Sequence, residues 1–153
     1  MHDDNDVSAA LRLFELAPRI TRLENAVLAG ATPALTFRQF RLLTRISQGL
    51  TTITQLGRIA TISLPAISES VEGLVRKGLV VRTTDPDDRR AVNLALTDEG
   101  EEALRTGEEL LADAAAQLLE EISPSGRERL TVDLERISER VAEALLRGPQ
   151  GRS

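Results

Sequence analysis

Two adjacent arginines, Arg89 and Arg90, stand in a short polar stretch near the middle of the chain. They follow Asp-Pro-Asp-Asp, a composition typical of a turn. Residues 80–83 on one side suit an extended chain, and residues 92–96 on the other alternate with the period of a half-buried strand. Residues 79–100 therefore predict a hairpin with basic groups at its tip, and such a tip can contact the phosphates or a groove of DNA.

The segment before the hairpin predicts a helix over residues 63–77. Ser63 is a good N-cap, Pro65 falls in the first turn, and Gly78 can close the helix as the residue after its end. One face is an apolar stripe of Leu64, Ile67, Val71, Leu74 and Val75. The opposite face presents Pro65, Ala66, Glu69, Glu72, Gly73 and Arg76. Small and polar groups there would let the helix approach a groove closely, so helix and hairpin together suggest a winged helix-turn-helix.

Helical spacing also predicts helices on both sides of this unit. The first runs from Val7 to about Leu28, with Asp6 as a candidate N-cap and a kink or division at Pro18. The other expected starts and stops are Thr36 to Ser47 with Thr36 as N-cap, a short helix over 51–60, a long helix capped by Thr97, and a last helix from Ser123-Pro124 to Gly148-Pro149.

Both terminal helical regions carry more apolar surface than a lone peripheral helix needs. They either pack on their own core or form a dimer interface, which a DNA reader also needs because two half-sites multiply affinity. We expect a mainly α fold with a small β-wing, dimeric, with its N- and C-terminal helices forming the dimerisation region. The expected division is 1–34 as an N-terminal dimerisation helix, 35–97 as the DNA-binding lobe and 98–153 as C-terminal dimerisation helices.

The distribution of charge favours nucleic acid although the total does not. The chain has a net charge of −5, yet residues 36–97 carry +4 and the remainder −9. DNA responds to the local patch rather than the total. Four arginines of this lobe are candidate phosphate contacts, with solvent exposure alone as the alternative for each: Arg38, Arg41, Arg58 and Arg76.

Composition excludes several other functions. There is no cysteine, and the one histidine is His2, so thiol chemistry, a Ser-His-Asp triad and a histidine-rich metal site are excluded. We expect no catalytic residue, metal or cofactor, because no nucleophile–base pair or phosphate loop is present. Aromatic residues make up 2% of the chain, which disfavours base stacking. No apolar run is long enough for a membrane, and the acidic start lacks a signal sequence, so we expect a cytoplasmic protein.

The same residues resemble the MarR family of bacterial transcription regulators. The similarity rests on Leu74–Arg82 with its Gly-Leu-Val, on Asp88-Arg89-Arg90, and on Leu96-Thr97 followed by Gly100, in that order. It extends back through Leu35-Thr36 and Gln39, Leu56-Gly57 and Ile62-Ser63. The resemblance implies a homodimer whose 63–77 helix enters the major groove and whose wing tip lies over the minor groove. Many members are repressors relieved by small, often aromatic or anionic, ligands.

The resemblance also implies roles for single residues. Arg90 would reach into the minor groove, Asp88 would hold basic side chains in place, and Arg89 would contact phosphate. The alternatives are an Asp88–Arg90 pair that only fixes the turn and an Arg89 in solvent. In the helix before the wing, the candidate contacts are Ser63, Pro65, Ala66, Ser68 and Glu69. Glu69 departs from the family, where a basic residue is common; it either accepts from cytosine or is a solvated carboxylate.

The family's effector pocket suggests a role for the three aromatic residues. Phe14, Phe37 and Phe40 lie where that pocket is usually found, and plain core packing is the favoured alternative. The absence of cysteine excludes the peroxide-sensing branch of the family.

Together these observations predict a sequence-specific regulator that binds a pseudo-palindromic operator, represses, and responds to a small aromatic or anionic effector. A winged-helix module that binds proteins instead of DNA is the alternative, motivated by Glu69 and the acidic total charge.

Overall fold

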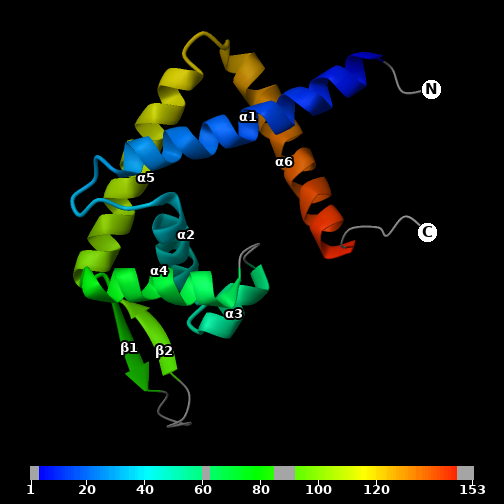
Figure 1. Ribbon diagram of the computed structural model, residues 1–153. Helices are drawn as coiled ribbons and strands as arrows, with labels where there is room; N and C mark the ends of the chain where they lie inside the picture. The colour runs from blue at the N-terminus through cyan, green and yellow to red at the C-terminus, as the bar shows by residue number, and fades with distance from the viewer. Residues whose placement is uncertain (1–3, 60–62, 85–91, 148–153) are drawn as a thin grey trace. The chain divides into compact units, whose positions relative to one another are not determined.

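The computed structural model describes residues 4–59, 63–84 and 92–147 (Figure 1). Its elements are α1 (Asp4–Leu28), α2 (Phe37–Ser47), α3 (Ile53–Ile59), α4 (Leu64–Arg76), β1 (Val80–Thr84), β2 (Val92–Leu96), α5 (Asp98–Leu118) and α6 (Pro124–Arg147). The predicted order of helices around a two-stranded wing is confirmed. Two compact units divide the chain, one ending at Ala114 and the other beginning at Ala115.

The N-terminus of α2 is held by side chains from two helices. Thr36 and Gln39 form a capping box: Thr36 Oγ1 accepts from the Gln39 amide at 3.1 Å, and Gln39 Oε1 accepts from the Thr36 amide at 3.3 Å. Asn25 of α1 adds a third bond, because its Oδ1 accepts from the Phe37 amide at 2.9 Å. Three of the otherwise unpaired amides are thus satisfied, and α1 is tied to the start of α2.

The first helix differs from the prediction in two ways. It begins at Asp4, so Asp6 lies inside the helix and is not its cap. It also continues past Pro18 without a division. Proline removes one bond to the carbonyl four residues earlier, at Phe14. Residues 11–23 are all exposed, so water can take the place of the missing donor.

The third helix is shorter than the predicted range, since it begins at Ile53. Thr52 acts as its cap: Thr52 Oγ1 accepts from the Gln55 amide at 3.1 Å, and Gln55 Oε1 accepts from the Thr52 amide at 3.0 Å. This is a second capping box, which fixes the start of the helix two residues later than apolar spacing alone suggests.

The boundaries of α4 agree with the sequence, but its faces differ in part. Ser63 is the N-cap residue, Pro65 lies in the first turn, and Gly78 has the left-handed φ of +71° after the end. Leu64 of the predicted apolar stripe is exposed. Gly73, predicted to face outward, is buried, and a Cβ there would stand 2.9 Å from Gln39 Nε2. The missing side chain is what lets α4 lie against α2.

The hydrophobic core of the first unit is built by every element from α1 to α5. The largest shares of its buried side chains belong to α2 and α4, and each of the other elements contributes one or two. The buried members include Leu28, Leu35, Phe40, Leu42, Leu43, Ile46, Leu56, Ile67, Val71, Leu74, Leu79, Val80, Leu94, Ala103 and Leu104.

The wing is an antiparallel pair in which Val80 lies opposite Leu96 and Arg82 opposite Leu94. Side chains at alternate positions share a face, so Arg82 lies on the same face as the buried Val80 and Leu94. On the edge of β2 that does not pair with β1, the Thr51 carbonyl accepts a hydrogen bond from the Leu94 amide at 2.7 Å.

The start of α5 is bound to the end of α4 through one hydroxyl. Thr97 Oγ1 accepts from the Gly100 amide at 3.0 Å, as predicted for an N-cap, and donates to the Gly78 carbonyl at 2.6 Å. A Cβ on Gly100 would lie 2.0 Å from the Leu79 carbonyl oxygen. Only glycine permits this approach of helix to backbone.

The second unit consists of the end of α5 and α6. Ser123 caps α6 as predicted, with its Oγ accepting from the Gly126 amide at 3.2 Å and Pro124 at the first position. No residue of α6 is buried. Among the described residues, no helix combines the length and apolar character that crossing a membrane requires.

Candidate nucleic-acid interface

The outward face of α4 is a line of residues at helical spacing. Pro65, Glu69 and Arg76 are exposed, and Glu72 is half-buried on the same line. Their separations of four, three and four residues place them one above the other on the helix. The face thus carries two carboxylates and one guanidinium, and it lies opposite the buried Ile67, Val71 and Leu74.

The N-terminal end of α4 offers two hydroxyls beside this line. Ser63 is exposed, and its side chain makes no capping bond to the helix, so its hydroxyl is available to another partner. Ser68 and Ala66 are half-buried. Positive partial charge and free amides at a helix N-terminus suit a phosphate there.

Glu72 is paired with Arg82 of the wing. The Arg82 guanidinium donates to Glu72 Oε1, and the two side chains are 40% and 45% exposed respectively. This hydrogen bond, and then the charge of Arg82, lower the pKa of Glu72, and Arg76 adds a smaller effect in the same direction. Glu72 is therefore ionised but paired, whereas Glu69 makes no ion pair among the described residues.

The remaining candidate arginines lie on α2 and α3. Arg38, Arg41 and Arg58 are all exposed, and α3 packs against α4. Arg41 stands over the ring of Phe37, 5.9 Å from its centroid, which fixes the guanidinium as a cation–π partner. Burial, and then the charge of Arg41, lower the pKa of Arg45.

The predicted wing-tip contacts cannot be placed in the same way. Asp88, Arg89 and Arg90 lie outside the described residues, and their roles stay predictions. The strands on either side of them are described: β1 pairs antiparallel with β2 and packs on α4.

Lys77, which the sequence leaves without a role, holds the end of α4 to the start of α2. Its Nζ donates to the Ala34 carbonyl at 2.6 Å and to Gln39 Oε1 at 2.9 Å. The same Gln39 oxygen completes the capping box of α2. Lys77 and Gln39 are 38 residues apart, and no sequence rule pairs residues at that separation. The sequence therefore identifies Lys77 only as the last residue of the helix predicted over 63–77.

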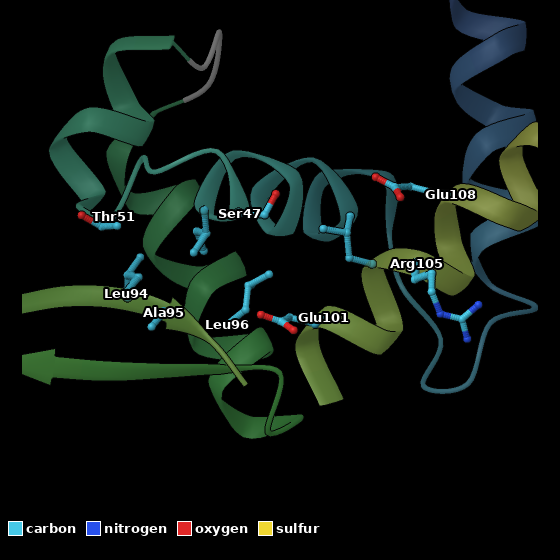
Figure 2. Close-up of a pocket in the computed structure, with 10 residues that line it drawn as sticks. Ser47, Thr51, Leu94, Ala95, Leu96, Glu101, Arg105 and Glu108 are labelled. Carbon is cyan, nitrogen blue, oxygen red and sulfur yellow. The ribbon is translucent and has the colours of Figure 1, made fainter. Parts of the chain in front are cut away.

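A pocket of about 470 Å³ lies between the end of α2, β2 and the first half of α5 (Figure 2). Its apolar lining includes Ile46, Leu94, Leu96 and Leu104, and its polar lining includes Ser47, Thr51, Glu101, Arg105 and Glu108. Arg105 is already paired with Glu102 and Glu109 on its own helix. The carboxylates of Glu101 and Glu108 thus give the pocket an acidic rim.

None of the three aromatic residues lines this pocket. Phe40 is buried in the core against Leu28 and Gly107, which accords with core packing. Phe37 is partly buried on α2, and Phe14 is 78% exposed on α1. The structure therefore places the three rings in three environments. No group of three side chains suited to a metal occurs among residues 4–59, 63–84 and 92–147.

Residues 35–91 match the model of the MarR family. This segment begins just before α2 and extends through α4 into the wing, the part of the chain that carries the candidate contacts. Over these residues the chain is similar to the MarR family. The winged helix-turn-helix predicted from its sequence is confirmed by the fold and by this match.

Solved structures of MarR-family proteins and other regulators share the fold. The apo form of wild-type MarR from E. coli is 26% identical, with a TM-score of 0.71 over 82% of this chain and 94% of that one. The transcriptional regulator BldR from Sulfolobus solfataricus is 24% identical, with a TM-score of 0.74 over 92% and 99%. A mutant of E. coli MarR complexed with operator DNA is 24% identical, with a TM-score of 0.68 over 87% and 96%.

Proposed function

We propose that this protein is a sequence-specific transcriptional regulator that binds double-stranded DNA. The observation that carries the proposal is the MarR-family match over residues 35–91, which coincides with the helix-turn-helix and wing. In this reading α4 enters the major groove and the wing tip contacts the adjacent minor groove. The operator complex of E. coli MarR supports DNA as the partner and favours this function over a protein-binding module. Its place of action would be the cytoplasm.

The proposed DNA-binding form is a homodimer. α1 and α6 each present exposed apolar side chains, among them Leu11, Phe14 and Leu16 on α1 and Leu134, Val141 and Leu145 on α6. Exposed apolar surface of this extent marks an interaction site. A second copy would cover it and would present two α4 helices to the half-sites of a pseudo-palindrome.

We further propose that the protein represses and that a small molecule relieves repression. The pocket of about 470 Å³ supports this, since ligand sites of roughly 300–1,000 Å³ are typical. Its acidic rim would repel an anion, so it suits a neutral or cationic molecule with an apolar part better than the anionic effector that the resemblance implies. The aromatic expectation at Phe14, Phe37 and Phe40 stays a prediction.

The proposed function is tested by selecting genomic fragments bound by the purified full chain. We expect an enriched pseudo-palindrome with half-site centres about ten base pairs apart, bound with an affinity that falls steeply with salt. Arg90→Ala should weaken binding by about 1–3 kcal/mol, because it removes the proposed minor-groove contact. Arg129→Ala, which changes an exposed arginine of α6, is the matched control and should leave affinity unchanged.

Selection without enrichment at moderate salt, together with no effect of Arg90→Ala, would contradict the proposed function. Repeating the selection with a panel of neutral, cationic and anionic aromatic compounds tests the effector. Relief by anions alone would contradict the charge argument for the pocket.

A further inference from the structure

The face of α4 that would meet DNA is poor in positive charge. Glu69, Glu72 and Arg76 sum to one net negative charge on a surface that must approach phosphates. Uncompensated carboxylates there would oppose binding, since like charges across an interface are strongly unfavourable. Some group outside α4 must therefore offset them if the proposed function is correct.

Arg82 is placed to do this by the register of the wing. It lies opposite Leu94, on the β-ribbon face that also carries the buried Val80. Consequently its side chain runs toward α4 rather than away from it, and its guanidinium donates to Glu72 Oε1. On the opposite face of β1, Val81 is exposed instead.

The pair sits at the right depth for charge compensation. Both side chains are about half exposed, so the pair remains at the surface that a DNA duplex would approach. The hydrogen bond to Arg82 lowers the pKa of Glu72, so the pairing favours the charged form of this carboxylate. Glu72 thus carries its charge at neutral pH, and the guanidinium that bonds to it is placed to offset that charge.

We propose that Arg82 compensates the charge of Glu72 at the DNA interface, and so acts on DNA binding through Glu72 rather than through a phosphate of its own. The inference rests on the proposed function, because it concerns the same surface. It identifies a residue of the wing base, outside the tip, that determines how readily α4 approaches DNA.

A double-mutant cycle tests this, with a fluorescein-labelled 30-base-pair duplex of random sequence as the probe. Binding of the full chain is measured by anisotropy over a series of salt concentrations. Arg82→Gln should weaken binding roughly fivefold or more at low salt, since it leaves Glu72 uncompensated. Glu72→Gln alone should bind as tightly as the wild type or more tightly, and the double variant should recover to within about twofold of it.

The outcomes separate the proposal from its rivals. If Arg82 bound a phosphate itself, the double variant would stay as weak as Arg82→Gln. If the pair were only a structural brace, Glu72→Gln would weaken binding as much as Arg82→Gln, and either result overturns the proposal. The double variant Arg140→Gln/Glu143→Gln removes an exposed ion pair on α6. It is the control for losing an ion pair as such. Wild-type protein that ignores the duplex at low salt would instead refute the proposed function.

Discussion

At the scale of single residues, Gln39 joins three parts of the DNA-binding lobe. Its backbone amide donates to Thr36 Oγ1 and its side-chain Oε1 accepts from the Thr36 amide, which completes the capping box. The same Oε1 also accepts from Lys77 Nζ. Its Nε2 lies against the space that a side chain at Gly73 would fill. One side chain therefore caps α2 and holds the far end of α4.

Replacing Gln39 tests this shared role. Gln39→Ala should lower the free energy of unfolding by about 1–2 kcal/mol, because a cap and the Lys77 acceptor are lost together. Gln39→Glu keeps an acceptor for both and should retain most of the stability. Urea denaturation at fixed protein concentration measures the difference, and equal losses in the two variants would contradict it.

Local chemistry explains which residue roles the sequence predicts. Thr36, Thr97 and Ser123 were identified as caps because an N-cap depends only on its own turn, and the structure confirms all three. The pair of Glu72 with Arg82 depends on strand register and on the packing of β1 against α4. No spacing rule within one element contains that information.

At the scale of elements, two glycines let α5 pack closely. A Cβ on Gly100 would meet the Leu79 carbonyl oxygen at 2.0 Å, and one on Gly107 would meet the Phe40 ring at 2.8 Å. Backbone cannot move aside as a ring can. The start of α5 is therefore the less tolerant of the two contacts.

We expect the two alanine variants to differ accordingly. Gly100→Ala should cost about 1–3 kcal/mol of unfolding free energy, beyond the gain of up to ~1 kcal/mol that alanine brings to a helix. Gly107→Ala should cost less, since Phe40 can shift by a few tenths of an ångström. Denaturant midpoints of both variants check the order, and a reversed order would show that α5 moves more easily than Phe40.

The buried face of a helix can be predicted from the sequence where apolar residues recur at a regular spacing. It cannot be predicted where it depends on a close contact with another element. The sequence places Ile67, Val71 and Leu74 in the core correctly. It misplaces Gly73, because a glycine counts as polar in a pattern although here it marks close helix contact, and it places the exposed Leu64 in the apolar stripe. Of the kink or division predicted at Pro18, the division is wrong, because the exposed helix tolerates one missing bond.

At the scale of the whole molecule, the second unit has no buried side chains of its own among the described residues of α6. Helices in proteins owe most of their stability to the packing of an apolar face. Val141→Glu should therefore convert a dimer into a monomer and weaken operator binding, measured by sedimentation equilibrium and anisotropy. Arg136→Gln lowers the net charge by the same amount at an exposed position on the opposite side of α6 and should leave the dimer intact.

The sequence predicts apolar terminal helices, but it does not identify the surfaces that these helices cover. The spacing of apolar residues indicates that a helix has an apolar face, but it does not indicate which surface packs against that face. For the same reason the pocket beside β2 was not predicted, since its lining joins Ile46, Leu94 and Leu104 from three elements.

The single hydroxyl of Thr97 has a mechanical consequence. It bonds the last carbonyl region of α4 at Gly78 and the first turn of α5 at Gly100 at the same time. This hydroxyl therefore couples the end of α4 to the first turn of α5 directly. In the proposed dimer, a shift of the first turn of α5 would then displace the end of α4, so the spacing of the two α4 helices would depend on a contact far from any base pair.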